Sequence, residues 1–270
     1  MALDPLYLAT AVEAALSAGA VQRTYFRREF RVSKKGPIDL VTEADVEVER
    51  AFRRLIAGRF PDHQVLGEED GIGTSPGSAR HRWIVDPIDG TTNFAHGLAL
   101  FCVSIALEID GQVALGVVYD PIGEELYTAE RGEGARLNGT RLAVSSCTAL
   151  IDALLCTGFP YSIQEERGEQ VRVFGAFLGH ARAVRRLGSA ALDLCYLAAG
   201  RFDGFWEERL HPWDIAAAAL IAEEAGGRVT DYDGGPYELS GRHIVVSNGG
   251  VHEAMLAVIR QARGPAGLPG

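Results

Sequence analysis

The apolar residues near the N-terminus recur at helical spacing. Over residues 6–16 they fall on one face of a helix, which predicts a helix that runs to about Arg28. A second helix is predicted after Thr42-Glu43-Ala44-Asp45, which resembles a capping box, because apolar residues at helical spacing follow over 46–56. The polar, glycine-rich segment 67–80 that comes next is expected to be a loop.

The following segments have the short apolar runs of strands. Trp83-Ile84-Val85 predicts a buried strand that stops at Pro87, because proline cannot donate a hydrogen bond to a sheet ladder. Residues 101–109 and 112–119 predict two more strands, and Asp110-Gly111 between them is typical of a tight hairpin. The first half of the chain is therefore expected to hold helices beside an antiparallel sheet.

From about residue 145 the pattern changes to short strands that alternate with helices. The predicted strands are 153–157, 183–185, 204–206 and 243–247, and the predicted helices are 188–199, 213–225 and 250–261. We therefore expect an N-terminal α+β lobe over 1–144 and a C-terminal α/β lobe over 145–270. No long linker separates the lobes, so they are expected to pack closely and to share a cleft.

The composition is that of a globular protein. The chain has 270 residues, of which 47% are hydrophobic, so it can bury a sizeable core. These values exclude a peptide hormone, a disulfide-stapled mini-protein and a disordered chain. The net charge of −10 does not favour a surface for polyanions, so nucleic acid is not an expected partner. The four cysteines form no CxxC pair, and we interpret them as reduced residues in or near the core.

No membrane partner is expected either. The longest apolar run, 98–107, is only about half of the ~20 residues that a membrane helix needs. Asp4 and Glu13 lie where a signal peptide would carry basic residues. We therefore expect a cytoplasmic protein.

Acidic residues carry the candidate chemistry. They gather in three segments, 68–70, 86–92 and 213–214. Carboxylates from separate segments can hold hard cations such as Mg²⁺. In enzymes of phosphoryl chemistry, such carboxylates often bridge two metal ions that lie ~3.5–4 Å apart. Asp86 and Asp89 flank Pro87 at the end of the predicted strand, so both are expected to point into a crevice. The turn at Gly90 could bind a phosphate through free N–H groups.

Each acidic residue also has a purely structural interpretation. Asp89 could be a helix N-cap, and residues 68–70 could be a solvated acidic loop. Asp214 could complement a helix dipole, and Thr42 with Asp45 could be a capping box alone. Each feature is modest by itself, and only their joint presence favours a metal site.

Together these motifs resemble the inositol monophosphatase family of Mg²⁺-dependent sugar phosphatases. The matching segments are Gly67-Glu68-Glu69, Trp83-Ile84-Val85-Asp86-Pro87-Ile88-Asp89-Gly90-Thr91-Thr92-Asn93-Phe94, His211-Pro212-Trp213-Asp214 and Glu224-Ala225-Gly226-Gly227. The resemblance implies a layered αβαβα sandwich with its active site between the two lobes. It also implies a small phosphorylated polyol or sugar as substrate, sensitivity to Li⁺ and, commonly, a homodimer.

Carried over by position, the resemblance implies two or three Mg²⁺ ions. One would lie among Glu68, Asp86 and the carbonyl of Ile88. A second would lie among Asp86, Asp89 and Asp214, and a third, weaker ion near Glu68.

The resemblance also assigns the catalytic residues. The substrate phosphate would be held by the ions and by the N–H groups of Gly90 and Thr91. The mechanism proposed for the family activates a metal-bound water through a threonine hydroxyl hydrogen-bonded to an aspartate, which here are Thr91 and Asp45. Glu69 would be an additional water contact.

Four further residues match positions around the substrate. Lys34 and Asp39 match a mobile active-site loop, although a solvated turn around Gly36-Pro37 also explains them. Glu207 matches a residue that contacts a substrate hydroxyl, and its alternative is a surface acid at a strand end. Ala190 lies in the matching pocket segment.

The sequence was also searched for motifs of other enzyme classes. The sequence contains no HExxH or Walker-type motif. Inositol-1-monophosphatase activity is the main prediction. Fructose-1,6-bisphosphatase, histidinol phosphatase and nucleotide 3′-phosphatase are alternatives, because specificity lies in pocket loops rather than in the metal motifs. A regulatory protein- or RNA-associated factor is the alternative from another class, and the intact set of acidic ligands argues against a scaffold that has lost catalysis.

Overall fold

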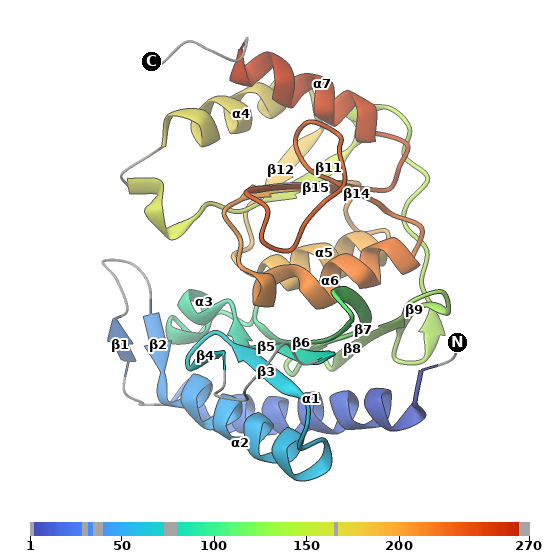
Figure 1. Cartoon of the computed structure of the whole chain (residues 1–270). Helices are drawn as coiled ribbons and strands as arrows, with labels where there is room; N and C mark the ends of the chain where they lie inside the picture. Colours follow the sequence, from blue (N-terminus) through green and yellow to red (C-terminus); the bar gives the residue numbers. More distant parts are fainter. Residues whose placement is uncertain (1–2, 29–31, 35–39, 73–79, 165–166, 265–270) are drawn as a thin grey trace.

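The fold is a stack of five layers, in which helices and sheets alternate (Figure 1). The computed structural model describes residues 3–28, 32–34, 40–72, 80–164 and 167–264. From one end to the other, the layers are α1 with α2, an eight-stranded sheet, α5 with α6, a five-stranded sheet, and α4 with α7. The αβαβα sandwich implied by the resemblance is therefore confirmed.

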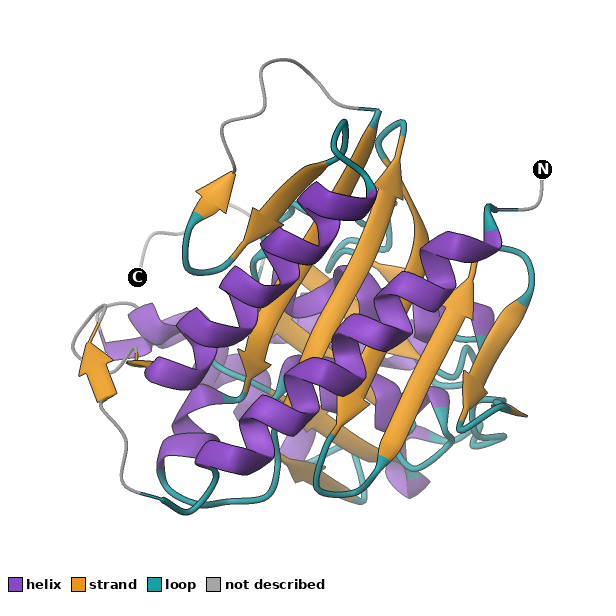
Figure 2. Cartoon of the chain, turned by 90° about the horizontal axis from the view of Figure 1, so that it is seen from below, coloured by secondary structure: helices purple, strands orange, loops and turns teal. Residues whose placement is uncertain are grey.

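The first layer consists of α1 (Pro5–Tyr25) and α2 (Glu43–Arg59), which cross one face of the eight-stranded sheet (Figure 2). Both predicted helices are confirmed, although α1 ends before Arg28. The predicted capping box is present at the start of α2, where Thr42 and Asp45 satisfy each other's backbone N–H groups. The short strands β1 (Val32–Lys34) and β2 (Leu40–Thr42) precede α2 and pair with each other.

The eight-stranded sheet has the order β10-β9-β8-β7-β6-β5-β3-β4. Its strands are β3 (Gln64–Gly67), β4 (Gly71–Ile72), β5 (His81–Asp89), β6 (Cys102–Ile109), β7 (Gln112–Asp120), β8 (Glu125–Glu130), β9 (Gly134–Leu137) and β10 (Thr140–Arg141). Among the described strands of this sheet, only β3 and β5 pair in parallel. The hairpin between β6 and β7 is confirmed, with positive φ at Asp110 and Gly111. The stretch 67–80 is not all loop, because it contains β4.

The prediction that the strand at Trp83 stops at Pro87 is wrong. β5 continues to Asp89, and its register against β6 shifts between Asp86 and Asp89. Asp86 pairs with Ser104 and Asp89 with Cys102, so β5 carries one extra residue in this interval. The missing N–H of Pro87 falls in that irregularity, where no ladder hydrogen bond is required of it.

The five-stranded sheet has the order β12-β11-β13-β15-β14. Its strands are β11 (Leu154–Thr157), β12 (Ala183–Arg185), β13 (Gly204–Glu208), β14 (Arg228–Thr230) and β15 (His243–Ser247). β11 pairs in parallel with β12 and β13, whereas β15 pairs antiparallel with β13 and β14. The four predicted strands are confirmed, and β14 was missed. Residues 142–153, which connect the two sheets, include the boundary expected between 144 and 145.

The remaining helices complete the layers. They are α3 (Thr91–Ala95), α4 (Gly168–Leu178), α5 (Ala190–Ala198), α6 (Pro212–Glu224) and α7 (His252–Arg263), with the 3₁₀ turns η1 (Leu150–Asp152) and η2 (Tyr161–Gln164). Helices α5, α6 and α7 are confirmed, whereas α4 was missed. The cysteines are unpaired, and all but Cys147 are buried, as predicted. Among the described residues, no helix is long and apolar enough to cross a membrane.

Helix α6 is buried on every side because it lies between two sheets. Its residues 215–222 are all buried, and most of them are alanine. Small side chains let the helix backbone approach the eight-stranded sheet closely. A Cβ added at Gly116 of β7 would lie 2.6 Å from the carbonyl oxygen of Ala217. The close contact between these layers therefore requires glycine at position 116 of β7 and a small residue, Ala217, on α6.

Gly116→Ala tests this close contact. The added methyl group must push α6 away from β7, so we expect the free energy of unfolding to fall by about 1–3 kcal/mol. Gly58→Ala is the matched control, because Gly58 is exposed on α2 and its Cβ would meet nothing within 4 Å. That control should raise stability by about 0.5–1 kcal/mol. Urea unfolding of both variants measures the difference, and equal shifts of the two midpoints would contradict the packing argument.

Candidate active site

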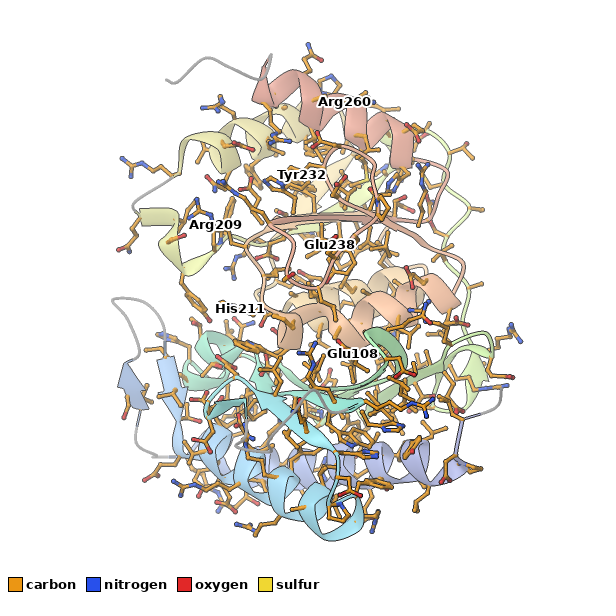
Figure 3. The ribbon with its side chains drawn as sticks, in the orientation of Figure 1. Glu108, Arg209, His211, Tyr232, Glu238 and Arg260 are labelled. Atoms are coloured by element: carbon orange, nitrogen blue, oxygen red, sulfur yellow. The ribbon has the colours of Figure 1, made fainter. Side chains whose placement is uncertain are left out.

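The predicted acidic residues meet where β5 ends, between the eight-stranded sheet and the layer of α5 and α6. Asp89 accepts hydrogen bonds from the Ser189 hydroxyl at 2.5 Å and from the Ala191 N–H at 2.8 Å, both at the start of α5. Asp214 lies in the first turn of α6, which His211 caps (Figure 3). The N-terminal ends of two helices are thus brought to the carboxyl end of a strand from the other lobe.

Asp86 and Asp89 are buried and Asp214 is half-buried, and each has one carboxylate oxygen held by the chain. Asp86 Oδ1 accepts the N–H of Ile88 at 2.9 Å, and Asp214 Oδ2 accepts the N–H of His211 at 2.7 Å. Asp89 uses Oδ2 for its hydrogen bonds to α5. The second oxygen of each carboxylate is not engaged by these donors.

Asp89 is not a helix cap, which was its structural interpretation from the sequence. The residue that precedes α3 is Gly90, which has φ of 100°, and no side chain caps this helix. A Cβ at Gly90 would lie 2.8 Å from the carbonyl oxygen of Leu100, so both the conformation and the space require glycine. The Asp89 carboxylate instead bridges the two lobes.

Burial dominates the electrostatics of this cluster. It raises the pKa values of Asp86 and Asp214 well above the ordinary range, and repulsion from neighbouring carboxylates, including Glu68, raises them further. Burial also raises the pKa of Asp89 to about 6, although its hydrogen bonds to α5 oppose the shift. The carboxylates therefore share a poorly hydrated space in which negative charge is unfavourable without a cation.

The donor set fits a hard divalent cation. Among the described residues, no lysine or arginine forms an ion pair with Asp86, Asp89 or Asp214. Nor do any three carboxylates of this cluster, within the described ranges, lie within 4.8 Å of one another. An ion held here would therefore keep several water ligands, as Mg²⁺ usually does.

The structure brings Asp45 and Thr91 together. Asp45 Oδ2 accepts the N–H of Thr42 at 2.8 Å, whereas Oδ1 lies 3.5 Å from the Thr91 hydroxyl. That hydroxyl is 2.9 Å from the carbonyl oxygen of Ile88, which is its nearer acceptor. Burial raises the pKa of Asp45 to about 7. The capping box and the contact with Thr91 coexist because they use different oxygens of one carboxylate.

Sequence reasoning missed Glu49, a fully buried residue one turn after Asp45 on α2. Its Oε2 accepts the N–H of Glu69 at 2.8 Å, and its Oε1 accepts the N–H of Asp70 at 3.0 Å. Arg53 binds the same Oε1 at 2.7 Å. The sequence contained one indication, a glutamate on the apolar face of α2 with an arginine four residues later.

The segment 68–70 is therefore not a freely solvated loop. Glu68 and Glu69 are half-buried, and a Cβ at Gly67 would overlap the Glu49 carboxylate. Glu68 also raises the pKa of Asp86, which places its charge beside the aspartate cluster.

Glu207 is not the surface acid that was its alternative interpretation. It is only 6% exposed, and burial, followed by the charge of Asp193, raises its pKa to about 8. A Cβ at Gly158 would overlap its carboxylate, so glycine is needed there. Ala190, at the start of α5, is buried one residue before the N–H that Asp89 accepts.

Asp193 is a second residue that sequence reasoning missed. It is 1% exposed on α5, and its Oδ1 has no hydrogen-bond partner among the described residues. Burial raises its pKa well above the ordinary range, and repulsion by Asp89 adds to the shift, whereas Arg186 opposes it. No motif surrounds Asp193, so nothing in the sequence distinguished it from a solvent-facing acid of a helix.

The predicted loop residues are not placed by the structure. Lys34 ends β1, but its side chain lies outside the described part of the chain. Asp39 lies outside the described residues altogether.

Comparison with known proteins agrees with this geometry. Residues 4–264 match the model of the inositol monophosphatase family. The inositol-1-monophosphatase of Rhizobium meliloti (strain 1021) is 45% identical, over 87% of this chain and 88% of that protein. The Nus factor SuhB of Pseudomonas aeruginosa is 42% identical, over 93% of this chain and 94% of that protein.

Solved structures give the same result. The extragenic suppressor protein suhB from Bartonella henselae has a TM-score of 0.90 at 39% identity and covers 95% of this chain and 99% of its own. The inositol monophosphatase from Anabaena (Nostoc) sp. PCC 7120 has a TM-score of 0.86 at 39% identity, with 95% and 96% covered.

Glu49→Gln tests whether the buried carboxylate holds the turn at 68–70. The amide offers only one acceptor and presents an NH₂ group to a backbone N–H, so we expect a loss of about 1–3 kcal/mol in unfolding free energy. If the aspartate cluster and Glu68 hold Mg²⁺, the affinity for Mg²⁺ should fall as well, because the turn carries Glu68. Glu47→Gln is the control, since Glu47 is exposed on the same helix. If the two variants unfold and titrate alike, Glu49 does not position the turn.

Proposed function

Because the chain belongs to the inositol monophosphatase family, we propose that it is a Mg²⁺-dependent phosphomonoesterase with inositol 1-phosphate as its preferred substrate. The observation that supports this proposal most is the cluster of Asp86, Asp89 and Asp214, in which each carboxylate has one oxygen anchored by the chain. Relatives named inositol-1-monophosphatase, at 45% and 44% identity, support the choice of substrate.

The residues that would hold two or three Mg²⁺ ions come mainly from the N-terminal lobe, 1–144. They are the carboxylates of Glu68, Asp86, Asp89 and Asp214 and the carbonyl of Ile88. When bound, Mg²⁺ supplies Lewis acidity, which lowers the pKa of water and spreads the charge of a phosphate group. Li⁺ sensitivity belongs to the same proposal, because Li⁺ would compete for these oxygen ligands. The C-terminal lobe, 145–270, contributes Asp214 and completes the substrate pocket.

Asp45 and Thr91 are suited to move a proton. With its pKa near 7, Asp45 can accept a proton at neutral pH. If the Thr91 hydroxyl turns from Ile88 to Asp45, its oxygen is free to accept a hydrogen bond from a water that attacks phosphorus. Glu69 would be a further contact for that water. The ester P–O bond breaks, and the leaving oxygen takes a proton from solvent.

Backbone groups would bind the phosphate of the substrate, and side chains would contact its alcohol half. The N–H groups of Gly90 and Thr91 begin α3, where no preceding turn of helix supplies acceptors for them, so they are suited to a phosphate oxygen. Glu207 and Ala190 lie on the C-terminal side of the site and would meet the alcohol half of the substrate. A buried carboxyl group suits a hydroxyl-rich polyol better than an apolar alcohol.

A second candidate function rests on the relatives named Nus factor SuhB. We infer a regulatory association with another protein, in addition to catalysis. The net charge of −10 disfavours direct binding of nucleic acid. We also propose that the protein forms a homodimer and is located in the cytoplasm.

A substrate panel with one variant tests the catalytic proposal. Phosphate release should be fastest from inositol 1-phosphate, slower from fructose 1,6-bisphosphate, histidinol phosphate and adenosine 3′,5′-bisphosphate, and absent without Mg²⁺. Asp86→Asn should lower kcat/KM by roughly 100-fold or more, because it removes a charge that faces the whole cluster. Asp152→Asn, on the exposed turn η1, is the control. A protein that hydrolyses none of the panel would be a regulator only, and full activity of Asp86→Asn would remove Asp86 from the metal site.

Glu207→Ala tests recognition of the polyol. Loss of the hydrogen bond between a substrate hydroxyl and this buried carboxyl group should lower kcat/KM for inositol 1-phosphate by roughly 10- to 100-fold. An aryl phosphate, which has no such hydroxyls, should be hydrolysed nearly as before by the same preparation. Glu208→Gln, whose side chain lies on the other face of β13, controls for disruption of the strand. A parallel loss on both substrates would instead make Glu207 a structural support of the metal site.

A further inference from the structure

A second group of potential metal ligands lies on the far face of the five-stranded sheet, away from the aspartate cluster. Glu208 is the last residue of β13, and the antiparallel register pairs it directly with His243, the first residue of β15. Glu169, in the first turn of α4, completes the group. One ligand atom of each residue lies within 4.8 Å of the others. Helices α4 and α7 cover this face of the sheet, where Tyr232 is also found (Figure 3).

Glu208 is a buried acid with an unused oxygen. Its side chain is only 2% exposed. Oε2 accepts a hydrogen bond from the Gln170 side chain at 3.1 Å, whereas Oε1 is buried and has no donor among the described residues. An unsatisfied carboxylate oxygen in a protein interior is unfavourable, so it points to a ligand.

His243 faces Glu208 with an unused nitrogen. Its Nε2 lies 3.9 Å from Glu208 Oε2 and has no hydrogen-bond partner in the described ranges. Burial, together with Arg263 and Arg242, lowers the pKa of His243 to about 4, so at neutral pH the ring is uncharged and offers a lone pair. The ring stacks on Tyr232 at 4.3 Å with an interplanar angle of 16°, which fixes its orientation.

The neighbouring cations do not satisfy these atoms. Arg263 directs its Nε to Glu169 Oε1 at 2.8 Å and its Nη1 toward Asp233 at 3.6 Å. Burial and the charge of Glu169 raise the pKa of Glu208, whereas Arg242, Arg263 and Arg209 oppose the shift. The group therefore holds two carboxylates and a neutral imidazole around one point, and only one of the carboxylates is paired.

We propose that Glu169, Glu208 and His243 form a second metal site, which binds Zn²⁺ or a similar first-row transition ion. An imidazole with carboxylates suits Zn²⁺, whereas the oxygen-only aspartate cluster suits Mg²⁺. The 3.9 Å between Glu208 and His243 is close to the roughly 3.3 Å between ligand atoms in tetrahedral Zn²⁺ with bonds of ~2.0–2.1 Å. Water would fill the fourth position. The ion would tie the first turn of α4 to the ends of β13 and β15.

The experiment separates the two sites by their chemistry. Full-length protein is kept in millimolar Mg²⁺, which occupies the oxygen-only cluster, and is dialysed against increasing Zn²⁺ with metal analysis by mass spectrometry. Co²⁺ replaces Zn²⁺ in a parallel series, because a low-coordinate site with an imidazole ligand gives a stronger visible absorption than octahedral oxygen coordination. Wild type should retain one Zn²⁺ per chain, show the Co²⁺ band and melt at a higher temperature with Zn²⁺.

Variants of the three residues test which of them bind Zn²⁺. His243→Asn and Glu208→Gln should weaken Zn²⁺ binding at least about 10-fold and abolish the Co²⁺ band. His180→Asn is the matched control, because His180 is exposed at the end of α4 and lies outside the group. Mg²⁺-dependent phosphate release and circular dichroism establish that each variant is folded. If His243→Asn does not fold, Glu169→Gln and Glu208→Gln carry the test.

Two results would overturn the proposal. One is unchanged Zn²⁺ affinity in His243→Asn and Glu208→Gln. The other is a Zn²⁺ ion that is lost in Asp86→Asn but kept in His243→Asn, which would place the ion in the aspartate cluster. Neither result bears on whether the protein hydrolyses phosphate esters, so this inference and the proposed function fail independently.

Discussion

Carboxylates buried between two closely packed lobes are the constraint on which the rest of the structure depends. Removing Asp86 and Asp89 from water, and Asp214 in part, is unfavourable, and the mutual repulsion of the three carboxylates adds to the cost. The chain offsets part of it by giving each carboxylate a backbone N–H donor. These donors come from the irregular part of β5, from the first turn of α5 and from the residue that precedes α6. A fold that hydrated the same residues would hold them less rigidly and would bind a cation less selectively.

The alanine-rich middle layer makes this arrangement possible. Helix α6 packs on both sheets at once, so large side chains on either face would separate the lobes and widen the space between β5 and the helix termini. The contact of Gly116 with Ala217 shows how close the backbones come. Core packing and site geometry are therefore coupled in this protein, because the distance between the layers also sets the distance between Asp89 and its donors on α5.

The sequence predicted those features whose causes are local. The capping box at Thr42, the hairpin at Asp110-Gly111 and the helices α5 to α7 depend on neighbouring residues, and the structure has them. Helix α4 escaped prediction because no side chain caps it and Gly168 begins it. The extension of β5 through Pro87 depends on an irregular register with β6, which no local pattern contains. Glu49 and Asp193 were missed for the same reason, because their roles arise only when distant segments meet.

The strand β13 shows how one short segment can serve two chemistries. Side chains of successive residues on a strand point to opposite faces, so Glu207 faces the layer of α5 and α6, and Glu208 faces α4 and α7. The sheet keeps the two carboxyl groups apart, and each has a different neighbourhood. Glu207 shares the field of Asp193 and Asp89, whereas Glu208 meets an imidazole and a glutamine. Two consecutive glutamates that look equivalent in the sequence are therefore distinguished by strand geometry alone: one belongs to the candidate substrate pocket, and the other has the surroundings of a transition-metal ligand.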